Sequence, residues 1–371
     1  MAMSSPTPEA AGQAYAAHRA HRGEALRRSA LGRHVVRLAV VLACVLMLSP
    51  ASGAQRIKMA TLSPEGSPWD TILKRMGKAW EEGTDGRVSL TIYPGGVAGD
   101  EPDILRKMKI GQYQAGAISV SGLVDIHKDF TIFEIPLFYD SFEEMEAVLA
   151  DLEPTLSGRL EERGYKLLGW GYVGWVHFFT TERAESVQQM QRLKIWTWAG
   201  DEAMGNWWRS NGFKPVALAA TDILTGLETG LIDAVSMPPL YAMQMQYYKK
   251  APYMADLPLA PMMGAILVSK RTFDRLSAAD QKVVLAAGRA AQKEVFEQIP
   301  KLDETAIQLM KGSGLELVTV DDTEHHKGWV KAAEEFAEAM RGEIVPVSIF
   351  DEALAARGKF RRQQAASGSG E

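Results

Sequence analysis

Hydrophobic positions in the middle of the chain alternate between the spacing of strands and the spacing of helices. Within residues 186–239, the apolar runs LKIWT, FKPVAL and LIDAVS are short and bounded by polar residues, which is typical of buried strands. Between the first two runs, residues 201–211 place Met204, Trp207 and Trp208 on one face of a predicted helix. A shorter helix is predicted between the second and third runs. This alternation predicts parallel strands joined by crossover helices, and such sheets bind ligands at the carboxyl ends of their strands.

The same alternation is found nearer the N-terminus. Apolar runs at 57–62, 87–94 and 114–123 predict further strands, the last of them continuing into a loop. The helix after the first run turns Trp69 and Trp80 inward. A chain of 371 residues is long enough to build two lobes, each with a core of its own. The predicted fold class is therefore α/β, with two lobes.

Two longer apolar patterns follow. The run at 165–181 is expected to cross from the first lobe into the second. A long helix is predicted to begin at a capping box, Ser277 to Asp280, and its inward positions continue as far as Ile299. Pro300 is expected to kink this helix or to end its first half.

Residues 1–54 predict export. Arg27, Arg28, Arg33 and Arg37 precede the apolar run 38–49, and the small residues SGA at 52–54 form a cleavage signal before Gln55. Because this run is short for a membrane-spanning helix, a cleaved signal peptide is favoured over an uncleaved anchor. The only cysteine, Cys44, lies in the same run, so the mature chain would have neither a thiol nor a disulfide.

Charge narrows the choice of partners. The chain has 41 Lys and Arg and 46 Asp and Glu, of which six Arg and two Glu lie in residues 1–54. The mature chain would then keep 35 basic and 44 acidic residues, a net charge of about −9. Such an acidic protein is not expected to bind nucleic acid or an anionic membrane surface through general charge. No stretch after residue 55 is long and apolar enough to span a bilayer.

Candidate chemistry is sparse in the mature chain. It contains no G-x-S-x-G, no H-E-x-x-H and no cysteine, and no motif for a metal or a cofactor. Gly95, Gly96 and Gly99 form a loop before a helix that Asp100 is expected to cap, but their spacing is not that of a nucleotide-binding loop. These features favour a binding protein without a cofactor over an enzyme.

The order of short motifs along the chain resembles one family. The central stretch contains LKI at 193–195, G-x-x-P-V at 212–216 and L-x-T-G-x-I-D-A at 227–234. Far from it, TDGRV at 84–88 and YPGG at 93–96 are followed by GDE and later by PLF. In this order the motifs resemble the substrate-binding proteins of TRAP transporters, the DctP-type periplasmic receptors for organic acids.

The resemblance implies a particular organisation. It implies the two-lobed fold of periplasmic binding proteins, with hinge strands and a long helix that spans both lobes. The first lobe would comprise 55–176 with 262–305, and the second would comprise 177–261 with 306–360. The low-complexity tail, 361–371, is expected to be disordered. The implied partners are a small-molecule ligand, the permease subunits of a TRAP-type transporter and, in some systems, a periplasmic helical-repeat protein.

Several positions at which the resemblance implies ligand contacts depart from the family pattern. Trp196 stands where the family has an arginine that clamps the ligand carboxylate, and Met237 stands where it has an asparagine. Leu259 lies near a position often held by histidine, and Ala220 lies near one often filled by an aromatic side chain. Apolar groups would therefore replace polar anchors.

These departures predict an apolar or amphipathic ligand. Trp175, Trp196 and Trp198 would supply aromatic surface, and Met237 would supply adaptable packing. The remaining predicted contacts are His177, Ser119, Ser121, Glu101 and Glu65. Trp196 could instead plug the cleft, and a lone histidine such as His177 is more often structural.

Two other interpretations stay open. In one, the protein is an organic-anion receptor whose charge anchor has moved to His177, Lys194 or Arg192. In the other, the protein has lost small-molecule transport and acts through protein partners as a periplasmic carrier or sensor subunit.

Overall fold

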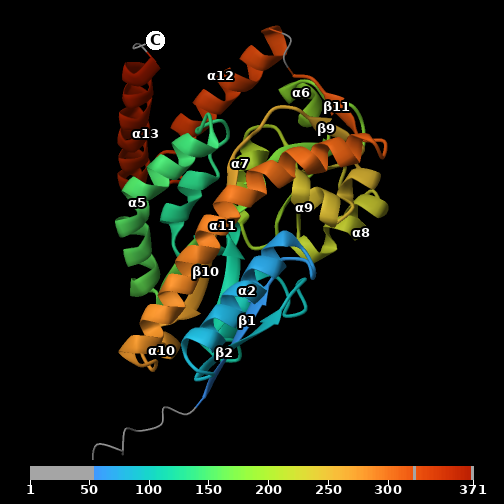
Figure 1. Cartoon of the computed structure of the whole chain (residues 1–371). Helices are drawn as coiled ribbons and strands as arrows, with labels where there is room; N and C mark the ends of the chain where they lie inside the picture. Colours follow the sequence, from blue (N-terminus) through green and yellow to red (C-terminus); the bar gives the residue numbers. More distant parts are fainter. Residues whose placement is uncertain (1–53, 321–322, 369–371) are drawn as a thin grey trace, which may run out of the picture. The chain divides into compact units, whose positions relative to one another are not determined.

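The strands of the protein form two sheets, as a computed structural model shows for residues 54–320 and 323–368 (Figure 1). Sheet A has the order β2-β1-β3-β10-β4, and sheet B has the order β11-β9-β5-β8-β6-β7. Sheet A consists of β1 (Gln55–Thr61), β2 (Val88–Tyr93), β3 (Ala115–Ser119), β4 (Tyr165–Trp175) and β10 (Pro261–Ser269). Sheet B consists of β5 (His177–Thr180), β6 (Lys194–Trp198), β7 (Lys214–Leu218), β8 (Ala234–Met237), β9 (Tyr253–Ala255) and β11 (Glu316–Val318).

Helices follow most of the strands. In chain order they are α2 (Pro68–Gly83), α3 (Glu101–Lys109), α4 (Val120–Ile126), α5 (Phe142–Glu162), α6 (Val187–Met190), α7 (Glu202–Ser210), α8 (Ile223–Glu228), α9 (Pro239–Gln244), α10 (Lys270–Phe273), α11 (Ala278–Lys311), α12 (Thr323–Met340) and α13 (Val347–Gly368). Three short 3₁₀ segments are η1 (Lys128–Phe133), η2 (Ala220–Asp222) and η3 (Tyr247–Lys249). Among the described residues, no helix combines the length and the apolar character needed to cross a bilayer. The predicted α/β fold class is confirmed.

Strand pairing is parallel where the central motifs predict it. In β6, Ile195 lies opposite Pro215 of β7 and Ala234 of β8, and both pairs of strands are parallel. β1 is likewise parallel to β2 and β3. The exceptions are the strands that connect the sheets, because β10 is antiparallel to β3 and β4, and β5 is antiparallel to β8 and β9. Both sheets are therefore mixed.

Local sequence signals explain where the helices begin. The Ser67 hydroxyl accepts a hydrogen bond from the Asp70 backbone amide, and Pro68 takes the first position of α2. On the inward face of α2, Trp80 is completely buried. Asp100 is the N-cap residue of α3, and its carboxylate accepts from the amide of the next residue, Glu101. The glycine loop before α3 is thus an entry turn.

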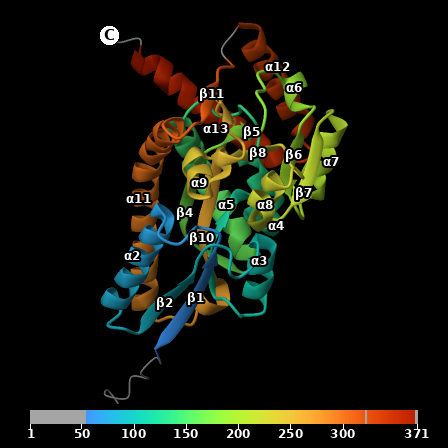
Figure 2. The same ribbon diagram turned by 90° about the vertical axis from the view of Figure 1, so that its right-hand side faces the viewer.

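The chain passes from sheet A to sheet B at one residue. β4 ends at Trp175 in sheet A, and β5 begins at His177 in sheet B, so the segment predicted to cross does so. The helix α11 packs against α2 and β4 and also against α9, which follows β8 of sheet B (Figure 2). It runs for 34 residues with Pro300 inside it, so this proline does not end the helix.

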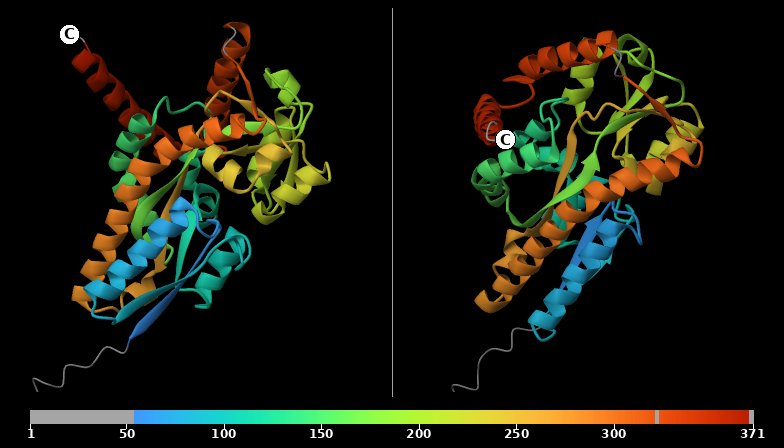
Figure 3. Two further views of the ribbon diagram at one scale, coloured as in Figure 1. Left: turned by 45° about the vertical axis from the view of Figure 1, so that its right-hand side comes forward. Right: turned by 45° about the horizontal axis from the view of Figure 1, so that its top comes forward.

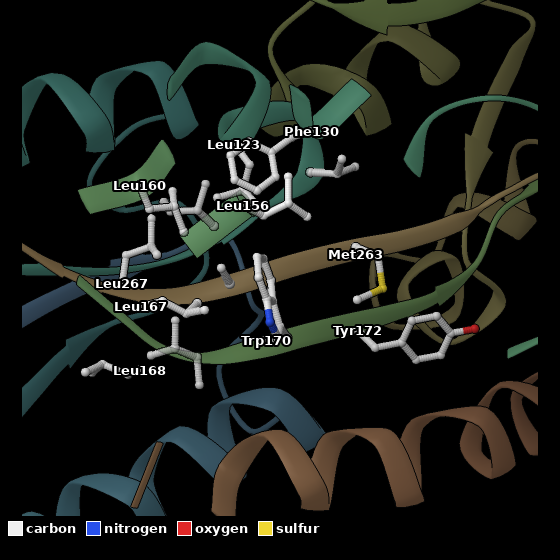
Figure 4. Close-up of a cluster of buried hydrophobic side chains, with 14 of the residues drawn as sticks. Leu123, Phe130, Leu156, Leu160, Leu167, Leu168, Trp170, Tyr172, Met263 and Leu267 are labelled. Atoms are coloured by element: carbon white, nitrogen blue, oxygen red, sulfur yellow. The ribbon is translucent and has the colours of Figure 1, made fainter. Parts of the chain in front are cut away.

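The core beside sheet A is large and mostly aliphatic. Leu156 and Leu160 of α5 meet Trp170 of β4 and Leu267 of β10, and all four are at most 1% exposed (Figure 4). The Trp170 indole donates to the Glu153 carboxylate at 3.1 Å. This packing holds β4 and β10 in place against α5.

Two expectations about local structure are wrong. Residues 120–123, the end of the stretch expected to be a strand continuing into a loop, belong to the helix α4. Residues 361–368, expected to be disordered, belong to α13, which lies beside α5 (Figure 3). There the Arg361 guanidinium donates to the buried Glu144 carboxylate at 2.5 and 3.1 Å, which ties the segment down. The predicted signal peptide lies outside the described residues, apart from Ala54, and so do residues 369–371.

Candidate functional site

Two cavities meet at Trp198 and Met262, which line both of them. We name each after its buried glutamate. The Glu101 cavity, of about 100 Å³, lies where the ends of β1 and β3 and the middle of β4 and β10 face residues from sheet B. The Glu134 cavity, of about 160 Å³, is lined by α4, the segment after η1, β6, α7 and α12. The Glu101 cavity lies where a ligand site is expected in such sheets, because the carboxyl ends of β1, β3, β6 and β8 line it.

The wall of the Glu101 cavity is apolar on both sides. From the sheet A side it includes Leu62, Trp69, Ile72, Leu73, Tyr172 and Ile266. From the sheet B side it includes Trp198, Ala220, Met237 and Tyr241. Among the described residues, no Lys, Arg or His lines either cavity. A ligand in the Glu101 cavity would therefore meet mainly hydrocarbon and aromatic surface, without a cationic anchor.

Glu101 is the acidic residue that lines this cavity, and neighbouring groups of the protein donate hydrogen bonds to its carboxylate. Its carboxylate accepts hydrogen bonds from the Ser119 amide at 2.7 Å, the Ser119 hydroxyl at 2.8 Å and the Gly122 amide at 2.9 Å. The side chain is 2% exposed. Burial raises the pKa of Glu101 to about 7, and these donors limit that rise. The arrangement fixes the end of β3 and leaves the carboxyl little capacity for a further donor.

Asp100 joins the two sides of the cavity directly. Its Oδ2 accepts from the Trp198 indole at 3.0 Å and from the Ala220 amide at 2.9 Å. Asp100 belongs to the N-terminus of α3, beside sheet A, whereas Trp198 ends β6 of sheet B. Burial raises the pKa of Asp100, and the three donors oppose that rise. One carboxylate thus links the sheets next to the cavity.

Asp303 of α11 fixes the crossing between the sheets. Its carboxylate accepts from the Trp175 amide at 3.3 Å and from the Leu240 amide at 2.8 Å. Burial raises the pKa of Asp303 to about 7. Gly174 lies directly against it with φ of +139°, a conformation that side chains rarely adopt. The last residues of β4 are therefore held by one buried acid.

The structure brings most of the predicted site residues together, but in two places. Glu101, Ser119, Trp198, Ala220 and Met237 line the Glu101 cavity. Ser121, Trp196 and Leu259 line the Glu134 cavity, together with Trp198. Their participation in ligand binding stays a prediction, and their positions agree with it.

Trp196 is 6% exposed and packs behind Trp198, with 5.4 Å between ring centroids. Its indole donates to the Leu218 carbonyl at 3.1 Å. Trp196 therefore lines the Glu134 cavity with its polar group satisfied, and Trp198 presents aromatic surface to both cavities.

Three predicted residues line neither cavity. His177 is 8% exposed, and its Nδ1 lies 2.9 Å from the Ala255 carbonyl, so its polar contact is made within sheet B. Burial lowers the pKa of His177, which favours the neutral ring. Trp175 ends β4 at the crossing, and Glu65 is exposed in the loop before α2.

Sequence reasoning missed several wall residues. Tyr241, Met262 and Trp69 line the Glu101 cavity, although their patterns indicated only core packing. Glu134 was missed despite a usable signal, since it is a lone acid within the apolar run FTIFEIPLFY. An acid in such a run is expected to be buried and therefore to need a partner.

Comparisons with known proteins agree with this architecture. Residues 59–342 match the family model described as bacterial extracellular solute-binding protein, family 7. The chain is 21% identical over 272 residues to the 2,3-diketo-L-gulonate-binding periplasmic protein YiaO of Escherichia coli, covering 72% of this chain and 81% of that protein.

Solved structures show the same fold. A TRAP periplasmic solute-binding protein of Pseudomonas putida with bound D-glucuronate matches with a TM-score of 0.72 at 20% identity, covering 81% of this chain and 97% of that one. Another, from Haemophilus influenzae with bound L-gulonate, matches with a TM-score of 0.74 at 18% identity, covering 83% and 99%. Since the family model spans well over half of its length, the chain belongs to family 7 of the bacterial extracellular solute-binding proteins.

Proposed function

We propose that this protein is a periplasmic receptor that captures a small apolar or amphipathic molecule in the Glu101 cavity and delivers it to a TRAP-type permease. Export by cleavage after residue 54 is part of this proposal. One observation carries the ligand class, namely that no described Lys, Arg or His lines the cavity. A carboxylate placed there would lose its hydration beside Glu101 and Asp100 without gaining a counter-charge, which is costly.

The main alternative is a receptor for organic anions, the class of ligand bound in the two solved relatives. It requires a cation near the cavity, and the three candidates are engaged elsewhere. Lys194 lies 3.3 Å from the Asp233 carboxylate, His177 is buried against Ala255, and Arg192 is outside both walls. None of the three lines either cavity. The apolar or amphipathic ligand is therefore the better-supported choice.

The proposed role is binding and release, with neither catalysis nor a cofactor. A ligand that binds better when the two sides of the cavity are together would stabilise that arrangement. The hydrogen bonds of Asp100 with Trp198 and Ala220 are part of that arrangement, in which the two sides of the cavity are together. The interpretation as a carrier or sensor acting through protein partners has no observation in its favour among the described residues, and a helical-repeat partner stays a prediction.

The first experiment identifies what the protein carries. The protein is purified without refolding and extracted with organic solvent, and the extract is analysed by mass spectrometry. A stoichiometric apolar or amphipathic molecule is the expected result. A stoichiometric small organic acid without an apolar part would contradict the proposed ligand class. If the protein is empty, thermal-shift measurements with matched series of apolar compounds and carboxylates decide between the two.

A further inference from the structure

The Glu134 cavity differs from the Glu101 cavity in the state of its acid. The Glu134 carboxyl accepts a hydrogen bond through Oε1, from the Ser121 hydroxyl at 3.1 Å. Glu134 Oε2 is buried and has no hydrogen-bond partner in the described part of the chain. A buried carboxyl oxygen without a donor is costly, and native structures rarely keep one without a reason.

A second acid lines the same cavity. Asp201 caps α7, its Oδ1 accepting from the Met204 amide at 3.0 Å. Asp201 and Asp125 both act on Glu134 through their negative charge. Lys128 acts on Asp201 and Lys109 acts on Asp125, but neither lysine lines the cavity. The local charge is thus negative, and no described basic side chain reaches the cavity to balance it.

Aromatic side chains form much of the rest of the cavity wall. Trp208 and Phe213 are in edge-to-face contact, with 4.6 Å between ring centroids, and Phe336 of α12 packs near Phe213. Trp329 of α12 completes this side. Aromatic faces attract cations as well as apolar groups.

From this geometry we propose that the Glu134 cavity binds a small organic cation, a primary amine carried on an apolar body of about one aromatic ring. The ammonium group would lie against Glu134 Oε2, with Asp201 as the second carboxylate, and the apolar body would pack on the aromatic wall. This cavity adjoins the Glu101 cavity and shares Trp198 and Met262 with it, but the proposal rests on Glu134 and does not depend on the proposed function.

The size of the cavity supports this occupant. At about 160 Å³, it is similar to engineered apolar cavities of about 150 Å³ that bind benzene. The same ligand would also stabilise the ionised form of Glu134. Burial, together with the negative charge of Asp201, raises the pKa of Glu134 to about 8, and an ammonium group would offset both effects.

Calorimetry with matched probes tests the site. The purified protein is titrated at pH 8.5 with phenethylamine, with the neutral phenethyl alcohol and with the anionic 3-phenylpropionate. The amine is expected to bind more tightly than the alcohol by about tenfold or more, since hydrogen bonds to charged groups are the stronger ones, and the anion is expected to bind least.

Variants locate the binding. Glu134→Gln is expected to lower the affinity for the amine by about tenfold or more, while the affinity for the alcohol changes by less than about twofold. Glu146→Gln, which removes an exposed carboxylate from α5, should leave all three affinities unchanged. Ala332→Leu, which narrows the cavity, should lower the affinity for both the amine and the alcohol. Circular dichroism checks that each variant is folded.

Three outcomes would overturn the proposal. The first is that the amine does not bind at millimolar concentration. The second is that the amine and the alcohol bind with equal affinity. The third is that a folded Glu134→Gln protein binds the amine as tightly as the natural protein does. Should Glu134→Gln fail to fold, an amine affinity unchanged by Ala332→Leu would overturn it as well.

Discussion

At the scale of single residues, buried acids distinguish this protein. Burial raises the pKa of Glu101 to about 7, of Glu134 to about 8 and of Asp303 to about 7. In the unfolded chain these groups ionise near their ordinary values. The folded protein therefore binds protons more tightly between those values and the raised ones. It follows that these groups make the protein less stable as the pH rises from about 4.5 to 8.

Glu134→Gln is expected to remove part of this pH dependence. The glutamine carbonyl can still accept from Ser121, and the side chain cannot ionise. The free energy of unfolding of the variant should approach that of the natural protein at pH 5 and exceed it at pH 8.5, with a gap that widens by at most about 1.4 kcal/mol per pH unit. Urea unfolding at the two pH values measures the gap. A gap independent of pH, or the same behaviour in Glu146→Gln, would contradict this assignment.

Trp196→Arg is expected to destabilise the protein by about 1–3 kcal/mol, because the guanidinium loses hydration and replaces an indole that belongs to the core cluster with Ala220, Ile223 and Met237. Glu134 and Asp201 line the same cavity as Trp196, so they can offset part of that cost. Denaturant unfolding measures the loss, and Trp196→Phe serves as the uncharged comparison. If the arginine variant gains carboxylate binding while it keeps native ligand binding unaltered, Trp196 has no part in an apolar pocket.

At the scale of elements, the end of β4 is a tightly constrained segment. A methyl group at Gly174 would lie 2.2 Å from Asp303 Oδ2 and 2.6 Å from the Pro238 Cβ, and the φ of +139° would be strained as well. We therefore expect Gly174→Ala to lower the free energy of unfolding by about 3 kcal/mol or more.

Gly158 is the matched control for this substitution. It lies within α5, and a methyl group there would meet no atom within 4 Å. Gly158→Ala should stabilise the protein by about 0.5–1 kcal/mol, because alanine favours the helix. Urea unfolding of both variants measures the contrast. Similar effects of the two changes would show that the crossing at Gly174 tolerates a side chain.

At the scale of the whole molecule, Asp100 is the group that links the two sheets beside the cavity. Asp100→Ala removes both carboxylate oxygens, so the contacts with Trp198 and Ala220 are lost together with the helix cap. We expect faster hydrogen exchange at the Ala220 amide, by about tenfold, and a larger radius of gyration in solution scattering. Asp85→Asn, at an exposed turn, should change neither quantity. Unchanged exchange at Ala220 would mean that Asp100 does not hold the sheets together.

The helix starts illustrate how much local sequence can predict. The caps at Ser67, Asp100 and Ser277 depend on contacts within three residues, and the caps at Asp100 and Ser277 were predicted, whereas Ser67 was expected to lie in a loop. The parallel strands around β6 follow from apolar runs and the helices between them. Residues 361–368 were misjudged, because their composition is polar and their helix depends on the contact of Arg361 with Glu144 in α5.

The sequence by itself determined the α/β class, the family resemblance, the crossing between lobes and a set of residues of which most line a cavity. These properties rest on periodicity and on short motifs, which are local. Tertiary structure alone decided that the set divides between two cavities, that His177 and Trp175 line neither, and that Glu134 and Asp201 line the second cavity together. Such outcomes depend on how segments distant in sequence pack against one another, and no local pattern encodes that packing.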